Sequence, residues 1–96
     1  MTAPEVLLRR PYSFQTDVWG LGCFFYTLLF RALPFRSDDD VINLKEELDV
    51  RAQPSPIGPL SDDALELAGL MLIKDQDKRI TISQILEHPW FDLDLN

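Results

Sequence analysis

The longest apolar run of the chain lies near its start, between residues 18 and 30. It is apolar nearly all round and has few β-branched residues, a pattern that predicts a helix buried on most of its faces. Thr16 is the predicted N-cap, and Asp17 in the first turn suits the positive end of the helix dipole. The helix is expected to end at about Phe30. The run is too short to span a bilayer, so no membrane partner is predicted.

A second pattern of apolar positions begins after Ser37. Ser37 and the carboxylates of Asp38–Asp40 are typical of a helix start, where free backbone amides accept caps and negative charge. Val41, Leu44 and Leu48 then fall on one helical stripe, with charged residues facing away. This pattern predicts an amphipathic surface helix that runs to about Leu48.

Two more helices are predicted in the second half of the chain. Three prolines and a glycine mark Ala52–Pro59 as a loop. A helix capped by its first residue is predicted over Ser61–Lys74. Thr81, with Gln84 three residues on, forms a capping box for the last helix, which ends before Pro89. The predicted fold class is therefore all-α, a small unit of about four helices with at most a helical turn ahead of them.

The overall composition is that of one small globular domain. The chain has 96 residues, of which 46% are hydrophobic and 26% are charged. A unit of this size buries a modest share of its surface and is only marginally stable. The net charge of −7 argues against a nucleic-acid partner, because phosphate backbones require clustered lysines and arginines.

The chain contains one cysteine, so it can form no internal disulfide. Cys23 lies in the apolar run, where a free cysteine usually packs as a small hydrophobic residue. A reactive thiol would require a basic and partly exposed setting, which the sequence does not provide. A lone cysteine agrees with a reducing compartment, and the predicted location is intracellular, in the cytoplasm or the nucleus.

Three other polar features do not predict a catalytic or metal-binding site. His88 has no nucleophile in any recognisable arrangement and is interpreted as a structural residue at a helix end. Asp38–Asp40 suit the dipole of the helix that they begin rather than a metal site, because no His or Cys lies nearby. Asp75–Asp77 are not followed by the Gly and Glu of an EF-hand loop. No catalytic, cofactor-binding or metal-binding residue is therefore predicted.

Four short motifs follow one another along the chain. They are Ala3-Pro4-Glu5, Asp17-Val18-Trp19-Gly20-Leu21-Gly22, Asp77-Lys78-Arg79-Ile80-Thr81 and His88-Pro89-Trp90-Phe91. Together they resemble the C-terminal part of the large lobe of a eukaryotic protein kinase domain. The last two motifs look more like the serine/threonine group than the tyrosine group. The resemblance implies that residues 1–96 form a partial kinase domain, from the Ala-Pro-Glu motif to the end of the domain.

The resemblance assigns structural roles to four residues. It implies that Glu5 pairs with Arg79, whose planar guanidinium can meet a carboxylate with two hydrogen bonds. Without the resemblance, both would be interpreted as solvated surface charges. Asp17 resembles the helix aspartate that holds the backbone of the catalytic loop in the family. That loop is absent here, so Asp17 is expected to cap or contact only its own helix end. Trp19 is expected to pack in the core.

Some positions depart from the family pattern or match it loosely. Gln76 replaces a common proline, and Arg31 stands where a glycine is common. Both are interpreted as tolerated surface changes. Arg9, Arg10 and Tyr12 fall where the family often has residues near the substrate-binding surface. These three are interpreted first as solvated loop residues.

The chemistry of a complete kinase is missing from the sequence. Phosphoryl transfer requires a Gly-rich loop, a strand lysine, and catalytic and metal-binding residues, and in the family all of these precede the Ala-Pro-Glu motif. Only Met1 and Thr2 precede it here. The prediction is a serine/threonine kinase segment that is inactive alone and binds neither the ATP nor the Mg of a complete kinase. The alternative is a non-catalytic module that docks kinases or their substrates, with the Val41–Leu48 helix and the loop before it as the candidate surface.

The helix that begins at Asp17 is the central post of the large lobe in the family, and much of its cover is missing from this sequence. An exposed apolar face marks either a partner site or an aggregation liability. The expected partner is the remainder of a kinase domain or a protein that covers this helix. Without either, the chain is expected to be marginal, molten or self-associating.

Overall fold

Helices and loops make up the whole of the described chain. The computed structural model describes residues 2–92. The α-helices are α1 (Pro4–Leu7), α2 (Phe14–Phe30), α3 (Asp38–Ile42), α4 (Asp62–Met71) and α5 (Ile82–Glu87), and two 3-10 turns are η1 (Val50–Ala52) and η2 (Pro89–Phe91). No strand occurs in these residues, so the all-α prediction is confirmed, with the short α1 as a fifth helix. Between residues 2 and 92, no helix is long and apolar enough to cross a membrane.

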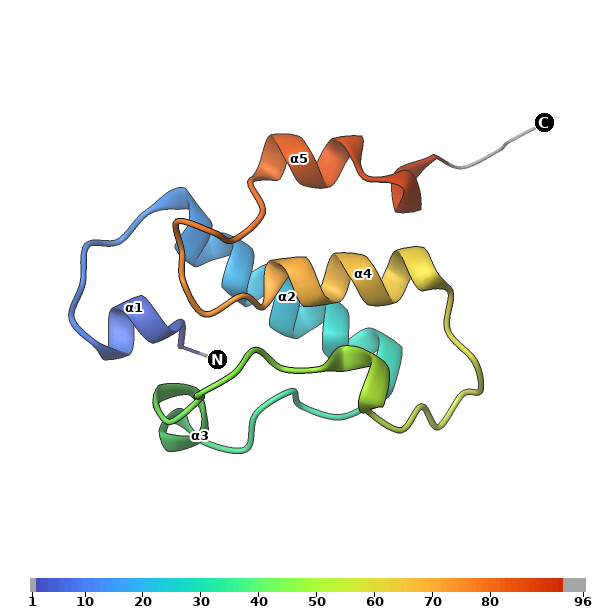
Figure 1. The fold of residues 1–96 in the computed structure, drawn as a ribbon, viewed down its shortest axis with the longest axis horizontal. Helices are drawn as coiled ribbons and strands as arrows, with labels where there is room; N and C mark the ends of the chain where they lie inside the picture. The colour runs from blue at the N-terminus through green and yellow to red at the C-terminus, as the bar shows by residue number, and fades with distance from the viewer. Residues whose placement is uncertain (1, 93–96) are drawn as a thin grey trace.

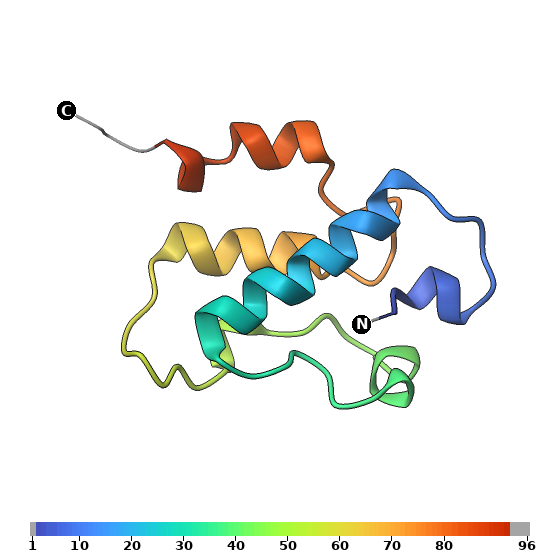
Figure 2. The same ribbon diagram turned by 180° about the vertical axis from the view of Figure 1, so that it is seen from behind.

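The crossing of α2 and α4 forms the centre of the molecule (Figures 1 and 2). Gly22 allows the two helices to approach closely, because a Cβ atom there would lie only 2.8 Å from the Cβ of Met71. Buried apolar side chains gather on both sides of α2, around Trp19 on one side and around Val18 on the other. α1 and α3 contact each other at one end of the molecule, and η2 contacts α4.

α2 begins earlier than predicted. Ser13 is the N-cap, and the helix starts at Phe14, so the prediction of Thr16 as N-cap was wrong. The Thr16 hydroxyl has other partners: it accepts a hydrogen bond from the Ser13 N–H at 3.1 Å and donates one to Glu5 at 2.8 Å. A residue at the third helical position that reaches back to the N-cap amide is the second half of a capping box. The predicted end at Phe30 is confirmed.

The predicted helix to Leu48 is much shorter in the structure. Ser37 caps α3 by accepting a hydrogen bond from the Asp40 N–H, as predicted, but α3 ends at Ile42. Lys74 donates from its ammonium group to the carbonyls of Ile42 at 2.7 Å and Leu44 at 3.0 Å. These are acceptors that a continuing helix would use for its own amides. Leu48 still packs against the core, although it is not helical.

The caps of α4 and α5 are those predicted. Ser61 accepts a hydrogen bond from the Ala64 N–H at 3.1 Å, and Thr81 and Gln84 form the reciprocal capping box of α5. α4 ends at Met71, one turn before the predicted end at Lys74. Just beyond this end, the backbone carbonyls of Ile73 and Lys74 accept hydrogen bonds from the Arg79 side chain.

Arg31 ends α2 in a left-handed conformation, with φ of 54°. Its side chain is exposed, as predicted for a surface change. The backbone, however, is in the region that glycine adopts freely and that costs other residues about 1 kcal/mol or more. The glycine common at this position in the family would be unstrained, so this departure carries a local cost that the sequence interpretation did not include.

Candidate functional site

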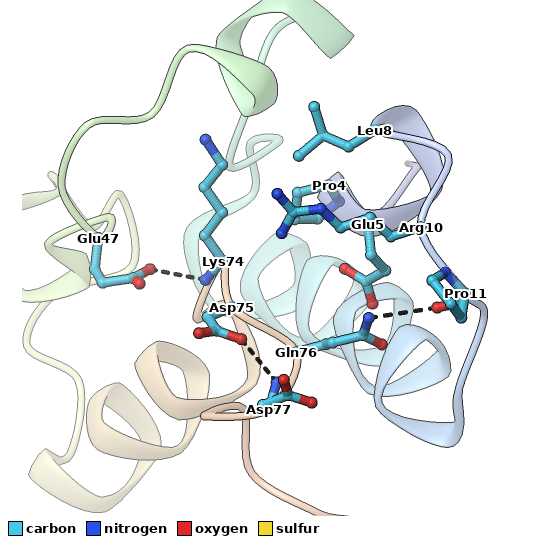
Figure 3. Close-up of a pocket in the computed structure, with 10 residues that line it drawn as sticks. All are labelled: Pro4, Glu5, Leu8, Arg10, Pro11, Glu47, Lys74, Asp75, Gln76 and Asp77. Carbon is cyan, nitrogen blue, oxygen red and sulfur yellow. Dashed lines mark hydrogen bonds between the residues drawn. The ribbon is translucent and has the colours of Figure 1, made fainter.

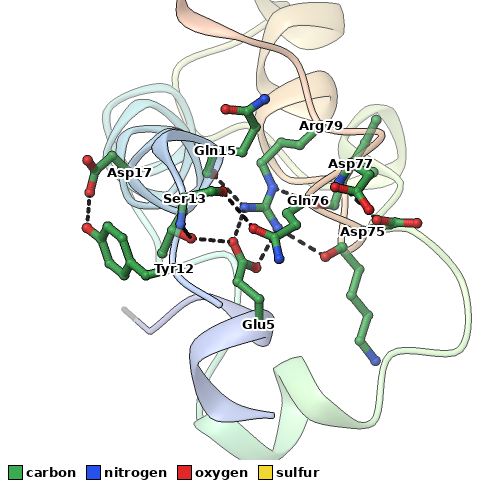
Figure 4. Close-up of polar contacts among 12 residues, drawn as sticks. Glu5, Tyr12, Ser13, Gln15, Asp17, Asp75, Gln76, Asp77 and Arg79 are labelled. Atoms are coloured by element: carbon green, nitrogen blue, oxygen red, sulfur yellow. Dashed lines mark hydrogen bonds and ion pairs between the residues drawn. The ribbon is translucent and has the colours of Figure 1, made fainter. Parts of the chain in front are cut away.

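Glu5 and Arg79 meet in the interior, next to the first turn of α2 (Figure 4). Arg79 Nη1 lies 2.7 Å from Glu5 Oε2, and Arg79 Nη2 lies 2.9 Å from Glu5 Oε1. The side chains are 0% and 3% exposed for Arg79 and Glu5, respectively. The structure thus brings together, in the two-bond geometry, the two residues that the kinase resemblance paired. We call this contact the Glu5–Arg79 clamp.

Every N–H group of Arg79 has an acceptor. Besides the two bonds to Glu5, Nε donates to the Ile73 carbonyl at 2.8 Å, Nη1 to the Gln15 carbonyl at 2.6 Å and Nη2 to the Lys74 carbonyl at 3.0 Å. A guanidinium has five N–H donors, and an unsatisfied buried donor is costly. The clamp therefore ties α1, the start of α2 and the turn after α4 to one another.

The electrostatics of the clamp favour the ionised carboxylate. Burial raises the pKa of Glu5, but hydrogen bonds from Arg79, from its own backbone N–H and from Thr16 act against burial, together with the positive charge of Arg79. The net result is a pKa of Glu5 below its ordinary value. A carboxylate that accepts several hydrogen bonds and faces a guanidinium is stabilised in its charged form.

Two residues beside the clamp were not assigned a role from the sequence. The Ser13 hydroxyl donates to Gln76 Oε1 at 2.7 Å, and Gln76 Nε2 donates to the Pro11 carbonyl at 3.3 Å (Figure 4 shows Ser13 and Gln76). Gln76 is half-buried. It is therefore more than the tolerated surface change that the sequence suggested, because it links the turn of Arg79 to the loop before α2. A proline there could make neither bond.

Trp19 packs beside the clamp in the core. Its side chain is fully buried and stacks on Phe35, with ring centroids 5.4 Å apart and an interplanar angle of 11°. The Arg79 guanidinium carbon lies 5.1 Å from the centroid of the Trp19 ring, within the range of a cation–π contact. Within residues 2–92, the indole N–H of Trp19 has no hydrogen-bond partner.

Asp17 lies away from the clamp, at the surface of the first turn of α2. It is exposed and accepts a hydrogen bond from the hydroxyl of Tyr12, which lies just ahead of the helix (Figure 4). This bond is the main reason that the pKa of Tyr12 is raised. Arg9, Arg10 and Tyr12 are all exposed. Within the described chain, the contact of Asp17 is therefore with the segment at its own helix end.

Farther along α2, one face of the helix is open to solvent. Phe24 is 62% exposed and Leu28 is 60% exposed, and Leu21 lies between them and the helix start. These three residues line an apolar cavity of about 210 Å³, together with Trp90 and Phe91 of η2. We call Leu21, Phe24 and Leu28 the open face of α2. A partner that covers this face stays a prediction.

A second, larger cavity of about 440 Å³ lies between α1 and the turn after α4 (Figure 3). Its lining mixes charges of both signs, and several of the polar groups are already engaged. Glu47 accepts a hydrogen bond from the Lys74 N–H at 2.9 Å, and Asp75 accepts one from the Asp77 N–H at 2.9 Å. These bonds hold the surrounding loops, and the lining does not define one class of ligand.

The other candidate residues of the sequence, Cys23 and the aspartate run, do not form a reactive or metal-binding site in the described residues. Cys23 is buried, and burial raises the pKa of its thiol to about 11, so the thiol is protonated and unreactive at neutral pH. Asp40 of the aspartate run accepts a hydrogen bond from the Arg36 N–H at 3.2 Å. Across residues 2–92, no cluster of three or more His, Cys, Asp or Glu residues is arranged to hold a metal ion.

Comparisons with known proteins identify the family. A family model for the protein kinase domain matches residues 1–91, and the chain belongs to this family. Calcium-dependent protein kinase 21 of Arabidopsis thaliana is 43% identical, over 92% of this chain and 17% of that protein. The SNF1-related protein kinase catalytic subunit alpha KIN12 of the same plant is 38% identical, over 94% of this chain and 18% of that protein.

A solved structure agrees with this assignment. The twitchin kinase region from C. elegans matches with a TM-score of 0.71 and 32% identity, over 93% of this chain and 16% of that chain. The helices described above thus have the arrangement of part of a kinase large lobe, and the related proteins are serine/threonine protein kinases. The chain spans less than a fifth of the length of the relatives named here.

Proposed function

We propose that this chain is the C-terminal scaffold segment of a serine/threonine protein kinase domain, and that it positions other parts of the domain without supplying chemistry. The whole domain would transfer phosphate from ATP to protein hydroxyl groups. The observation that carries the proposal is the buried Glu5–Arg79 clamp, which joins residues 74 positions apart. A contact of this kind fixes geometry but contains no group free to react.

The clamp fixes the position of the first turn of α1. Glu5 lies in the first turn of α1, and its carboxylate is held by Arg79 and by Thr16 of α2. α1 therefore cannot rotate or shift without breaking a buried ion pair, which is strongly unfavourable. A chain segment joined to α1 would be held at a fixed place beside the first turn of α2.

We further propose that the 96 residues alone neither bind Mg-ATP nor transfer phosphate. Their four glycines, at positions 20, 22, 58 and 69, do not form a phosphate-binding loop. Isothermal titration of the chain with Mg-ATP is expected to give no saturable heat. Saturable binding would contradict this part of the proposal.

The scaffold role can be tested in a chimera. Residues 2–91 would replace the matching segment of calcium-dependent protein kinase 21, which is 43% identical. Kinase activity of the folded chimera, and its loss in the same chimera with Arg79→Met, are the expected results. The chimera with Arg51→Met, which breaks an exposed ion pair, is the matched control and should stay active. A folded but inactive parent chimera would contradict the scaffold role.

A second candidate function is a non-catalytic module that binds a kinase or a kinase substrate. The open face of α2 favours it, since exposed apolar surface beside a cavity suits a protein partner. The docking surface first predicted, the Val41–Leu48 helix, is a poor candidate because Val41 is fully buried and α3 ends at Ile42. A kinase whose binding to this chain is abolished by Phe24→Gln would support this function.

A further inference from the structure

His88 occupies a junction that the kinase resemblance did not explain. It lies between α5 and η2 and is buried, with a side chain that is 5% exposed. Its Nδ1 atom accepts a hydrogen bond from the Trp90 N–H at 3.1 Å and so caps η2. Its Nε2 atom lies 2.8 Å from Glu66 Oε1 of α4. The ring thus connects η2 to α4 through both of its nitrogen atoms.

These two contacts define the tautomer of the neutral ring. Nδ1 must carry a lone pair to accept from the Trp90 N–H, so the proton of neutral His88 is on Nε2, where it is donated to Glu66. An added proton can only go to Nδ1. It would place an N–H group on Nδ1 facing the Trp90 N–H, two donors with no acceptor between them. Protonation therefore removes the cap of η2.

The turn that His88 caps forms one wall of the apolar cavity. Trp90 packs edge-on against Phe25 of α2, with ring centroids 5.1 Å apart at 85°, and Phe91 packs against Trp90 at 4.9 Å. Both aromatic residues line the cavity together with the open face of α2. A change in the cap of η2 thus changes the wall of this cavity.

The charged groups around His88 act differently on its neutral ring and on its protonated ring. Glu66 is the acidic group that faces the ring from α4, while α2 presents the apolar Phe25 to this region, and Glu87 and Asp92 flank the turn in sequence. Within residues 2–92, Glu66 is the one acidic side chain that contacts the His88 ring, and the two form an ion pair only when the ring is protonated. Glu66 favours an imidazolium, but its side chain is 56% exposed, and water screens such a pair. A protonated His88 ring, in contrast, would be a buried charge with little solvation, and it could no longer cap η2.

We propose that His88 is a proton-sensitive latch: in its neutral form it caps η2 and holds Trp90 and Phe91 over the apolar cavity, and protonation releases them. Protonation of Nδ1 on acidification then opens the cavity beside the open face of α2. This inference concerns the chain's own fold and does not depend on the proposed kinase scaffold role.

The test compares the chain with His88→Asn at about pH 7.5 and about pH 5.5, on either side of the ordinary histidine pKa. Asparagine keeps an oxygen that can accept from the Trp90 N–H, but it does not titrate. Between the two pH values, the unfolding equilibrium constant of the parent chain should rise about fivefold more than that of His88→Asn, the amount expected for one lost cap. Urea unfolding followed by circular dichroism gives both constants.

A second readout reports the latch directly. In nitrogen-15 NMR spectra, the backbone amide signal of Trp90 should shift with pH in the parent chain, and the contacts between the Trp90 and Phe25 rings should weaken. Neither change should occur in His88→Asn. Parallel pH responses of the two proteins, or a parent chain that gains stability at low pH relative to His88→Asn, would overturn the proposal. Absence of cooperative unfolding at about pH 7.5 would also overturn it, because the latch requires a formed cavity.

Discussion

The clamp contacts the start of α2, and the open face lies farther along the same helix. The two regions differ in how completely this chain covers them. At the start of α2, each donor of Arg79 finds an acceptor and the ion pair is closed to water. About three to four turns later, Phe24 and Leu28 are more than half exposed. The charged interior contact is complete within this chain, whereas the apolar surface is not. The comparison indicates that the segment holds its own internal geometry and leaves an apolar face exposed. In our proposal, another part of a kinase domain would cover this face.

Breaking the clamp should have the largest effect. Arg79→Met strands the buried Glu5 carboxylate and should lower the free energy of unfolding by about 3–5 kcal/mol, enough to unfold most of a marginal domain. The matched control is Arg51→Met, which removes the exposed pair with Asp62, whose side chains are 50% and 90% exposed for Arg51 and Asp62. That change should cost at most about 1 kcal/mol. Urea unfolding followed by circular dichroism measures both, and equal losses would remove the distinction between the two pairs.

Acid should weaken the same contact gradually. The pKa of Glu5 is lower in the folded chain than its ordinary value, so its charge contributes stability that is present above the unfolded-state pKa. This contribution is lost as the pH falls through the lower, folded-state pKa. Unfolding measured at a series of pH values below about pH 4.3 should show a steeper loss for the parent than for the Glu5→Gln/Arg79→Met double variant. Curves of equal slope would show that other carboxylates dominate the acid response.

Two glycines of α2 test the difference between its covered face and its exposed face, because Gly22 lies against α4 and a Cβ atom at Gly20 would have no neighbouring atom within 4 Å. Gly22→Ala places a Cβ atom 2.8 Å from the Met71 Cβ and should destabilise the chain by about 1–3 kcal/mol through overpacking. Gly20→Ala meets nothing within 4 Å, and alanine is the better helix former, so this change should stabilise the chain by up to about 1 kcal/mol. Thermal melts of the two variants should move in opposite directions. A shift in the same direction would show that the α2–α4 crossing is looser than described.

The smallest effect on stability is expected on the open face. Phe24→Gln removes an exposed ring and should change the free energy of unfolding by no more than about 0.5 kcal/mol. It should, however, reduce self-association, because it removes apolar surface from the face that lacks a cover. Sedimentation velocity at several concentrations compares the variant with the parent. If the parent is already monomeric at high concentration, the open face does not drive association.

Local signals in the sequence predicted much of the secondary structure. The caps at Ser37, Ser61 and Thr81 are each made by a residue within three positions of its partner, so the sequence contains the whole interaction. The end of α3 was mispredicted because it depends on the ammonium group of Lys74, more than thirty residues away. Amphipathic spacing alone contains no information about such a distant competitor for the backbone carbonyls.

The site itself was only partly accessible from the sequence. Composition and spacing favoured solvated charges for Glu5 and Arg79, and only the resemblance to kinases suggested their contact. The link from Ser13 to Gln76 departs from the family pattern and joins residues 63 positions apart, so neither local patterns nor the family could predict it. The assignment of residues 1–96 to a partial kinase domain includes Met1 and residues 93–96, which lie outside the described residues.

The double-mutant cycle on Glu5 and Arg79 tests the central claim most directly. Unfolding free energies are measured for the parent, Glu5→Gln, Arg79→Met and the double variant, and the cycle yields the energy of the pair itself. We predict a coupling energy of at least about 2 kcal/mol, with the double variant more stable than expected from the sum of the single losses. A coupling energy near zero would contradict the account, because the clamp would then hold neither α1 nor the start of α2 in place.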